Sequence, residues 1–528
     1  MIRIHAENEL ASLALALIGP GAKLSSTERD YAIVVRRHPD GALVKATRRS
    51  IAAGDDPLGG CLTRIRTPEV RRPDGATYTP APIVESMLAW AASEGTPGRV
   101  VDPGAGSGRF LLAAGKRFPK ARLVAFEIDP LALLILRANV TARGMADRTV
   151  VVAGDFRSAP LPEFDGTTLF VGNPPYVRHH DIEERWKSWF ADSAGLYGMK
   201  ASKLAGLHIH FFLRTMQTAR PGDYGAYITS AEWLDVNYGS VLRRLLANGL
   251  GGTALHVLDP KAMPFEDAIT TGAITCFRVG QRPNALRVRI VKSVSRLGDL
   301  SAGTAVPWER VEQATRWSTI VRPGPKVPAG YIELGELCRV HRGQVTGNND
   351  VWISGPHTRD LPRRFLLPTV TKAREILEAG DVLNDNGSLR RVVNLPTDLD
   401  GIAPEELGAI TRFLEWAKRY NADKSYTAEH RRAWWAVGLK DPAPIICTYM
   451  ARRPPAFVLN RCKARHINIA HGLYPLEPMP EKLLARLADW LRNNVGVDQG
   501  RTYAGGLTKF EPKEVERIPV PRPEILVA

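Results

Sequence analysis

The order of apolar and polar positions predicts alternating strands and helices between residues 71 and 285. Short β-type runs are separated by longer stretches with helical spacing, which is typical of a doubly wound, mostly parallel α/β sheet. The last two strands have no helix between them, so we expect them to close the sheet as an antiparallel hairpin. Strands are expected at 99–102, 123–128, 149–155, 167–172, 224–229, 255–258 and 273–279, and helices at 109–118, 130–143, 205–219 and 240–248.

Breaks in this pattern divide the chain into four segments. Residues 1–70 are expected to form an N-terminal extension of unknown role, with a strand over 31–36. The α/β domain occupies residues 71–285, and residues 286–329 are interpreted as a connector that ends in a proline-rich stretch. Residues 330–528 mix short strands, loops and a few helices, so we expect a separate α+β domain.

Composition and charge indicate an ordinary soluble protein with a basic C-terminal half. The net charge is +16, and residues 281–528 hold 38 Lys and Arg residues against 27 Asp and Glu residues. This bias favours a polyanionic partner. The five cysteines lack the spacing of a metal site, so no metal and a reducing cytoplasm are expected. The apolar run at 10–19 is too short to cross a bilayer and follows acidic residues, which predicts an amphipathic helix and no membrane association.

A glycine-rich turn follows the first strand of the α/β domain. The segment Asp102-Pro103-Gly104-Ala105-Gly106-Ser107-Gly108 joins that strand to the next helix. Glycines let the backbone approach a ligand closely, and the helix N-terminus offers free N–H groups. Nucleotide, flavin and nicotinamide sites share such turns, but the G-x-G-x-G spacing departs from the dinucleotide pattern. It fits S-adenosylmethionine, which has a carboxylate and an ammonium group and no pyrophosphate.

Acidic residues end the next two expected strands. Glu127 is placed to accept hydrogen bonds from both ribose hydroxyls of such a cofactor, and Asp155 from its adenine amino group. Phe156 is placed to pack on the adenine ring. In an open parallel sheet, ligands bind at the carboxyl ends of strands, where these residues lie. The alternative for Glu127 is a helix-capping role shared with Asp129.

The strand at 167–172 ends in the tetrapeptide Asn173-Pro174-Pro175-Tyr176. Two prolines after a buried strand favour a rigid, extended loop. An aromatic amine is a poor nucleophile because its lone pair is delocalised into the ring. If the Asn173 side-chain oxygen and the Pro174 carbonyl accept its two N–H groups, the lone pair is directed at the sulfonium methyl group by positioning and electrostatics. Tyr176 would stack on a base flipped out of the duplex.

With these motifs in order, the chain resembles the gamma class of N6-adenine DNA methyltransferases, the layout of the TaqI modification enzyme. Residues 75–84 are similar to the family motif that holds the methionine end of the cofactor. The resemblance implies a Rossmann-like, seven-stranded S-adenosylmethionine-dependent methyltransferase domain followed by a mixed α+β target-recognition domain. It also implies that Phe265 stacks on the other face of the flipped adenine. The cofactor-binding residues implied are Tyr78, Thr79, Pro80, Asp102, Pro103, Gly104, Ala105, Gly106, Gly108, Glu127, Ile128, Asp155, Phe156 and Asn173.

The segment 342–351 is similar to the opening of the family's recognition domain, and 507–521 is similar to its close. Basic and aromatic residues interleave between them, so Lys and Arg could neutralise phosphates while Arg and Asn read base edges. The expected DNA-binding residues are Arg342, Thr346, Asn348, Asn349, Arg452, Arg453, Lys463, Arg465 and Lys509. The expected partners are double-stranded DNA and a separately encoded restriction endonuclease or defence subunit, and the expected location is the bacterial cytoplasm.

The same tetrapeptide serves methyltransferases that act on a protein glutamine or on RNA bases. The long basic C-terminal half argues against the glutamine substrate, whereas RNA stays open because stacking of a flipped base works equally well on single strands. Methylation of cytosine N4 in DNA is a third alternative, because both amines suit the same geometry, but the motif order and the leading asparagine resemble the adenine enzymes more. A DNA-binding subunit with a vestigial cofactor fold is a fourth alternative, but each motif position keeps a chemically competent residue.

Overall fold

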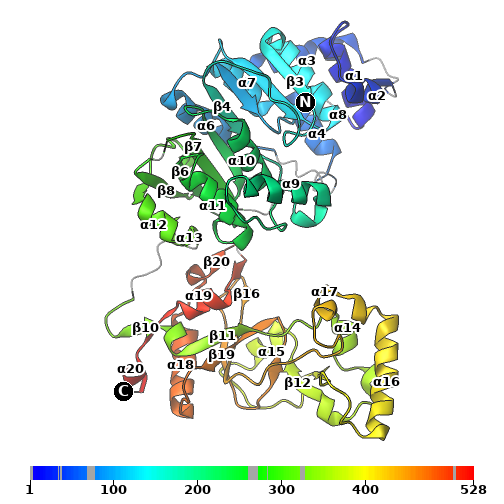
Figure 1. Cartoon of the computed structure of the whole chain (residues 1–528), viewed down its shortest axis with the longest axis vertical. Coiled ribbons are helices and arrows are strands. Elements are labelled where there is room, and N and C mark those ends of the chain that lie inside the picture. The colour runs from blue at the N-terminus through cyan, green and yellow to red at the C-terminus, as the bar shows by residue number, and fades with distance from the viewer. Residues whose placement is uncertain are drawn as a thin grey trace. The chain divides into compact units, whose positions relative to one another are not determined.

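The computed structural model describes residues 4–33, 35, 39–67, 70, 78–259, 271–281, 283–314, 316–321, 327–502 and 507–527. The chain divides into two compact units, Met1–Pro323 and Gly324–Ala528 (Figure 1). Each unit has its own sheet and its own apolar cores. Among the described residues, no helix has the length and apolar character needed to cross a membrane.

The first unit is built on a nine-stranded sheet in the order β3-β2-β1-β4-β5-β7-β6-β8-β9. Strands β1 to β5 are parallel, and β7 lies antiparallel between β5 and β6. The doubly wound sheet and its closing hairpin are therefore confirmed. The strands are β1 (Arg99–Asp102), β2 (Arg122–Glu127), β3 (Thr149–Ala153), β4 (Thr168–Gly172), β5 (Tyr224–Ser230), β6 (Gly252–Leu258), β7 (Gly272–Arg278), β8 (Ala285–Val291) and β9 (Thr304–Pro307).

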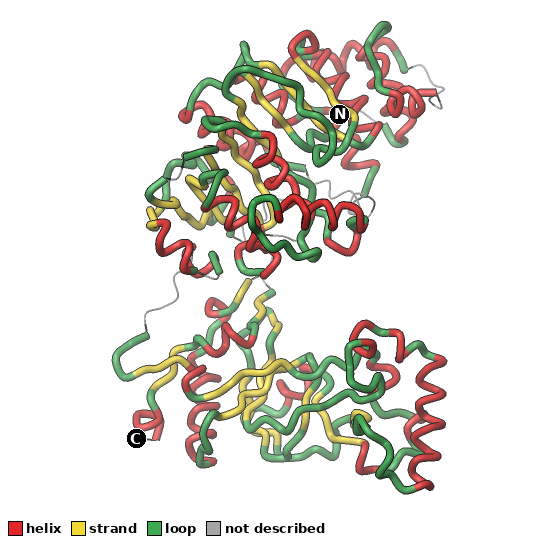
Figure 2. Tube along the Cα trace, in the orientation of Figure 1, coloured by secondary structure: helices red, strands yellow, loops and turns green. Residues whose placement is uncertain are grey.

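Helices cover both faces of this sheet, as Figure 2 shows. Alternate residues of one strand point to opposite faces, so Val100 belongs to one apolar core and Val101 to the other. Both cores lie between the sheet and its helices and hold the strand ends in fixed positions. The helices are α6 (Ala81–Glu94), α7 (Arg109–Arg117), α8 (Pro130–Ala142), α9 (Glu184–Gly195), α10 (Leu207–Thr218) and α11 (Ser240–Ala247).

The interpretation of residues 286–329 as a connector is wrong for most of that segment. Strand β8 pairs parallel to β6, and β9 pairs antiparallel to β8, so the sheet has nine strands and not seven. Helices α12 (Trp308–Gln313) and α13 (Ser318–Val321) follow, and Trp308 and Trp317 join the same aromatic cluster as Trp233. The end of the βα rhythm misled the prediction, because an edge hairpin extends a sheet without a crossover helix.

The N-terminal residues also differ from the prediction. The strand expected over 31–36 is wrong, because Tyr31 lies in helix α2; residues 34 and 36 are outside the described part of the chain. A reciprocal capping pair marks the start of this helix, since Glu28 N–H donates to Ser25 Oγ and Ser25 N–H donates to the Glu28 carboxylate. The helices are α1 (Glu7–Ile18), α2 (Ser26–Ile33), α3 (Gly41–Ala53) and α4 (Pro57–Ile65).

The second unit is a mixed α+β fold, as expected. A five-stranded sheet in the order β11-β19-β15-β17-β13 packs its apolar face against α18, and two three-stranded sheets and a two-stranded one complete the strands described. Its longer helices are α16 (Pro404–Arg419) and α18 (Glu481–Asn494). The strands of the main sheet are β11 (Cys338–Arg342), β13 (Val382–Leu383), β15 (Ile445–Thr448), β17 (Phe457–Asn460) and β19 (Ala470–Pro475).

Candidate active site

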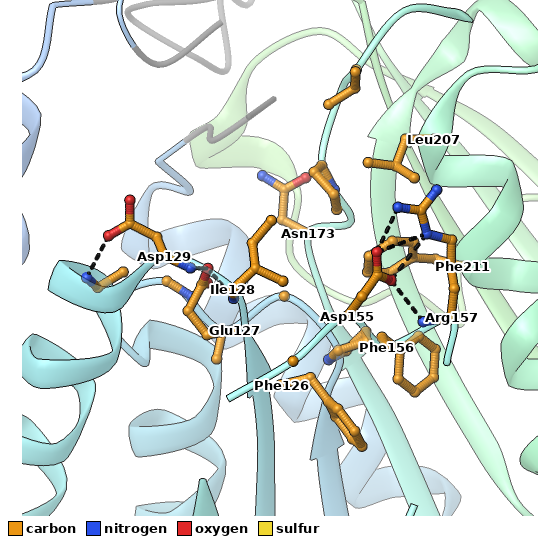
Figure 3. A pocket seen from close by; sticks show the side chains of 18 of the residues that line it. Phe126, Glu127, Ile128, Asp129, Asp155, Phe156, Arg157, Asn173, Leu207 and Phe211 are labelled. Atoms are coloured by element: carbon orange, nitrogen blue, oxygen red, sulfur yellow. Dashed lines mark hydrogen bonds and ion pairs between the residues drawn. The ribbon is translucent and has the colours of Figure 1, made fainter. Parts of the chain in front are cut away.

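A cavity of about 360 Å³ opens at the carboxyl ends of β1, β2, β3 and β4 (Figure 3). This volume is in the range of small-molecule sites. Three of the expected cofactor residues do not line the cavity: Pro80, Asp102 and Gly108. Each lies within two residues of one that does. The expected residues that line it are Tyr78, Thr79, Pro103, Gly104, Ala105, Gly106, Glu127, Ile128, Asp155, Phe156 and Asn173.

The glycine turn approaches the cavity with backbone that other residues would distort. Gly106 and Gly108 have φ values of +53° and +92°, in the left-handed region that favours glycine. A Cβ atom at Gly108 would also lie 2.6 Å from Leu136 Cδ1. At Gly104, a side chain would project into the space next to Pro175 and Phe211. The turn therefore leaves room for a ligand and leads into the N-terminus of α7, whose N-cap residue, Gly108, has no side chain to cap the helix.

Asp102 supports this turn from behind. Its side chain is buried, with 1% of its surface exposed, and it does not line the cavity. Burial raises the pKa of Asp102 to about 8, although the backbone amides of Gly104 and Leu111 act in the opposite direction. A Cβ atom at residue 172 would lie 2.7 Å from Asp102 Oδ1, which explains why glycine ends β4. Asp102 therefore lies behind the backbone of the glycine turn and outside the cavity.

Glu127 lines the cavity and at the same time holds the glycine turn. Its Oε2 atom accepts a hydrogen bond of 2.8 Å from Gly106 N–H, and Oε1 accepts bonds from Ile128 N–H and Asp129 N–H. Burial raises the pKa of Glu127, and these three amides oppose the increase. Asp129 caps α8 by accepting from Ala132 N–H, and Glu127 contributes to the same helix start by accepting from the Asp129 N–H. Glu127 is therefore held where cofactor hydroxyls could share its oxygens.

At the end of β3, Asp155 has a partner that the sequence did not suggest. Arg157 donates from its backbone N–H and its Nε atom to Asp155 Oδ1, and from Nη2 to Oδ2 at 2.5 Å. The Arg157 guanidinium also stacks 3.9 Å from the ring centre of Trp186, at the start of α9. Arg157 Nε also donates to Oδ2 at 3.1 Å, yet the Asp155 side chain lines the cavity and is 21% exposed, so a ligand amine can still reach it. Phe156 is buried and contacts Phe126 edge-on at 5.1 Å.

The tetrapeptide lies between these two halves of the cavity. Figure 3 shows Asn173 above the gap between Ile128 and Asp155. Asn173 Nδ2 donates a hydrogen bond of 3.0 Å to Thr79 Oγ1, so the acceptor oxygen of the amide is directed away from Thr79. Thr79 is buried and lies in the segment just before α6. This bond holds the Asn173 amide with its nitrogen toward Thr79 and its oxygen away from Thr79.

Of the other predicted catalytic residues, the structure describes Pro174, Pro175 and Tyr176. Pro175 lines the cavity, and Pro174 is buried outside its wall. The Tyr176 ring is half-buried and packs edge-on to His208 at 6.4 Å, while burial of its hydroxyl raises the pKa of the phenol well above its usual range. Phe265 lies outside the described residues.

In the second unit, several of the expected DNA-binding residues are engaged within the protein. Thr346 is buried and donates to Asn349 Oδ1, and Asn348 caps the short helix α14 (Asn349–Trp352). Arg465 donates to the carbonyls of residues 439 and 440 and pairs with Asp441. These side chains shape loops. By contrast, the side chains of Arg452, Arg453 and Lys463 are exposed.

Arg342 and Lys509 form a separate group around Tyr449. The Arg342 guanidinium lies 5.2 Å from the Tyr449 ring centre and donates to its hydroxyl, and Lys509 Nζ lies 6.0 Å from the same ring. Lys509 also pairs with Glu511. The antiparallel pairing of β16 (Met450–Ala451) with β21 (Thr508–Lys509) brings this group next to residues 452 and 453. Of the nine expected residues, Thr346 is buried, so the nine do not form one exposed surface.

Sequence reasoning missed the residues that hold the site together. Asp56, Leu62 and Arg66 belong to α4 and its ends, and Trp186 belongs to α9, segments that had no assigned role. Arg109 is the first residue of α7, and Arg157 lies two residues after Asp155, which was its only sequence signal. The missed residues are Asp56, Leu62, Arg66, Arg109, Arg157 and Trp186.

The cavity has the groups that S-adenosylmethionine requires. The glycine turn and the N-terminus of α7 suit its carboxylate, and Glu127 suits its hydroxyls. Ile128 is 57% exposed and, with Phe156, provides apolar walls for a flat ring whose amino group would meet Asp155. The residues present therefore fit this cofactor.

Comparison with known proteins agrees with this site. Residues 328–527 match the family described as type II methyltransferase M.Eco57I, C-terminal domain, and residues 161–258 match the Eco57I restriction-modification methylase family. Residues 85–196 match the methyltransferase small domain. The type II methyltransferase M.XamI of Xanthomonas campestris pv. amaranthicola is 55% identical over 537 residues, which cover 99% of this chain and 100% of that protein.

Two further similarities are weaker or shorter. The release factor glutamine methyltransferase of Mycolicibacterium smegmatis is 38% identical, but over 105 residues, which are 19% of this chain and 36% of that protein. The structure of the type IIL restriction-modification enzyme MmeI in complex with DNA aligns with a TM-score of 0.52 at 13% identity, over 91% of this chain and 75% of that one. This likeness supports the fold. The chain belongs to the type II methyltransferases of restriction-modification systems, and its cofactor is S-adenosylmethionine.

Proposed function

We propose that this chain transfers the methyl group of S-adenosylmethionine to the N6 amino group of an adenine in double-stranded DNA. Methylation of DNA follows from membership of the type II methyltransferases. The choice of adenine N6 is our inference, and it rests on the resemblance of the motif order and of the leading Asn173 to the N6-adenine enzymes. Because the Asn173 side-chain nitrogen donates to Thr79, its oxygen is directed away from Thr79, and Asn173 lines the cavity; we infer that a substrate amine meets this oxygen.

The reaction needs a nitrogen lone pair that is withdrawn from the aromatic ring. If Asn173 Oδ1 and the Pro174 carbonyl each accept one N–H of the target amine, the nitrogen becomes more tetrahedral and its lone pair is directed toward the cavity. The bound cofactor supplies an electrophilic methyl group on its sulfonium. Fixed acceptors of this kind act by orientation and by stabilising developing positive charge. The N–C bond would form as the sulfonium S–C bond breaks, and the cationic nitrogen would then release one N–H proton to solvent, so no strong base is required.

The target base must leave the duplex to reach this position. Tyr176 supports such a step because its ring is half-buried while its hydroxyl is held inside the protein, which leaves ring surface for stacking. We carry over from the family resemblance that Phe265 contacts the other face of the base.

We assign recognition of the DNA site to residues 330–528. The net positive charge of the C-terminal half and the exposure of Arg452, Arg453 and Lys463 support phosphate contacts there. As the modification component of a restriction-modification system in the bacterial cytoplasm, the chain would protect DNA from a separately encoded endonuclease.

The test is transfer of labelled methyl groups from S-adenosylmethionine to mixed-sequence duplex DNA, followed by identification of the labelled nucleoside. We expect N6-methyladenine with the wild type and no label with Asn173→Ala. Asn284→Ala is the matched control, because Asn284 is exposed at the start of β8, and it should keep activity. Label in N4-methylcytosine would overturn the choice of base. Label in RNA or protein but not in DNA would overturn the substrate.

A further inference from the structure

We propose that the N-terminal helices α1 to α4 are part of the cofactor site, and that Asp56 is the positioning residue through which they act. The proposal concerns cofactor binding and does not depend on which base is methylated. It gives a role to residues whose sequence matched no motif. Four observations carry it: a hydrogen-bond hub, a close helix approach, a connection to Asn173 and two cavity walls.

The hub is the Asp56 carboxylate, whose side chain is 11% exposed. Its Oδ2 atom accepts hydrogen bonds from Tyr78 Oη at 2.8 Å, Ser107 Oγ at 2.7 Å and Arg109 Nε at 3.2 Å. These donors come from the segment before α6, from the glycine turn and from the first residue of α7. One carboxylate therefore ties together three segments that border the cavity.

The helix that carries Asp56 approaches the glycine turn closely. Asp56 Oδ1 accepts from Gly59 N–H at 2.9 Å, which caps α4, and from Asn139 Nδ2 of α8 at 3.2 Å. Asn139 Nδ2 also donates to the Ser107 carbonyl. A Cβ atom at Gly59 would lie 2.7 Å from Ser107 Oγ, so glycine is needed for this approach. The contact is built into the sequence of α4.

The network extends to the catalytic tetrapeptide. Arg109 Nη1 donates to the Thr79 carbonyl at 2.8 Å, and its guanidinium lies 3.1 Å from the Tyr78 ring centre. Burial lowers the pKa of Arg109, and the Asp56 charge opposes this, so Asp56 is the counter-ion that keeps this half-buried cation in place. Thr79 in turn holds the amide of Asn173.

The same helices supply walls of the cavity. Leu62 of α4 lines the cavity, and so does Arg66, the residue directly after this helix. Arg66 is fixed by ion pairs to Glu7 at 2.8 Å and to Asp129 at 2.5 Å, next to Ile128. This places the N-terminal helices beside the nucleoside end of the cofactor, where Glu127 and Ile128 lie.

Apolar packing anchors these helices on α8, as Figure 1 shows for α1. The buried cluster includes Leu10, Leu13 and Leu58 from the N-terminal helices and Leu134 and Ile135 from α8. Deletion of the helices would expose this surface and impair folding, so deletion cannot distinguish a positioning role from a general stabilising one. Point substitutions at Asp56 can.

The test measures binding of S-adenosylmethionine and of S-adenosylhomocysteine to the full chain by calorimetry. Loss of a buried, charged hydrogen-bond acceptor should weaken binding by roughly ten- to a hundredfold in Asp56→Ala. Asp56→Asn should be intermediate, because an amide oxygen still accepts. Asp55→Ala is the matched control, since Asp55 is exposed and its carboxylate accepts from Ser50.

A double-mutant cycle distinguishes positioning from loss of stability. If Asp56 acts through Tyr78, then Tyr78→Phe weakens cofactor binding in the wild type and adds little in the Asp56→Ala background. In turnover with DNA, the KM for the cofactor should rise more than kcat falls. Wild-type affinity in a folded Asp56→Ala protein, or fully additive effects in the cycle, would overturn the proposal. Folding is checked by cofactor-free thermal unfolding, and if Asp56→Ala does not fold, Asp56→Asn decides by the same criteria.

Discussion

Replacement of Thr79 by valine tests whether the orientation of the Asn173 amide contributes to catalysis. Thr79 is 3% exposed, and its hydroxyl accepts the 3.0 Å hydrogen bond from Asn173 Nδ2. Valine has nearly the same shape and removes only this acceptor. Without it, the amide loses the preference that directs its oxygen away from residue 79. A rotated amide would present N–H groups to an amine that also carries N–H groups.

The size of the effect follows from the free energy of that preference. A hydrogen bond from a buried donor contributes about 1–2 kcal/mol once the cost of leaving the donor unpaired is included. Because about 1.4 kcal/mol corresponds to a factor of ten in rate, methyl transfer should slow by roughly 5- to 30-fold. Thr79→Ser keeps the hydroxyl and should stay within about twofold of the wild type.

The assay is single-turnover methylation of a duplex substrate with both enzyme and cofactor saturating, which isolates the chemical step from product release. The expected result is a slower single-turnover rate in Thr79→Val with little change in cofactor affinity. A wild-type rate with a raised KM for S-adenosylmethionine would refute the reasoning, since it would assign Thr79 to cofactor binding alone.

Three further predictions concern the buried acid, the glycine turn and the basic surface. Burial raises the pKa of Asp102 to about 8, so the protonated carboxyl contributes stability that is present below about pH 4 and is lost as pH rises through about 8. Over this range the urea midpoint of the wild type should fall relative to that of Asp102→Asn. Parallel profiles of the two proteins would contradict this prediction. Gly108→Ala should destabilise the protein by about 1–3 kcal/mol and weaken cofactor binding, whereas Gly144→Ala, at φ +64° with no atom near its Cβ, should show the smaller backbone cost in thermal unfolding. Joint replacement of Arg452 and Arg453 by alanine should reduce the slope of log affinity for DNA against log salt by about 0.9 for each phosphate that is no longer neutralised, with unchanged cofactor binding. Joint replacement of exposed Arg374 and Arg486 is the control, and an equal change in slope would contradict the assignment of this surface.

Residues that line the cavity because of their local position were predictable from the sequence. The glycine turn follows β1, Glu127 is the last residue of β2 and Asp155 lies two residues after β3, so finding each strand places the residue at the sheet edge. The strands themselves were predictable because buried parallel strands are short, apolar and bounded by turns. The order of strands then brought these separate strand ends to one cavity.

Residues that act across the fold were not predictable in this way. Asp56 is separated from Ser107 by 51 positions and from Asn139 by 83, and no local pattern records that they meet. The reciprocal capping pair of Ser25 and Glu28 was present in the sequence, and with it α2 could have been recognised as a helix and not a strand. Even so, helices alone do not show which surface they pack against.

Local motifs and the rest of the fold also differ in what they indicate about the substrate. A protein amide and an exocyclic base amine are both planar nitrogens with delocalised lone pairs, so one tetrapeptide can orient either. Consistent with this, the similarity to a release factor glutamine methyltransferase extends over 105 residues, whereas the similarity to M.XamI extends over 99% of the chain. The motifs therefore indicate transfer of a methyl group to a planar nitrogen. The nature of the molecule that carries that nitrogen must be determined by the parts beyond the shared motifs, and in this chain the largest of these is the basic second unit.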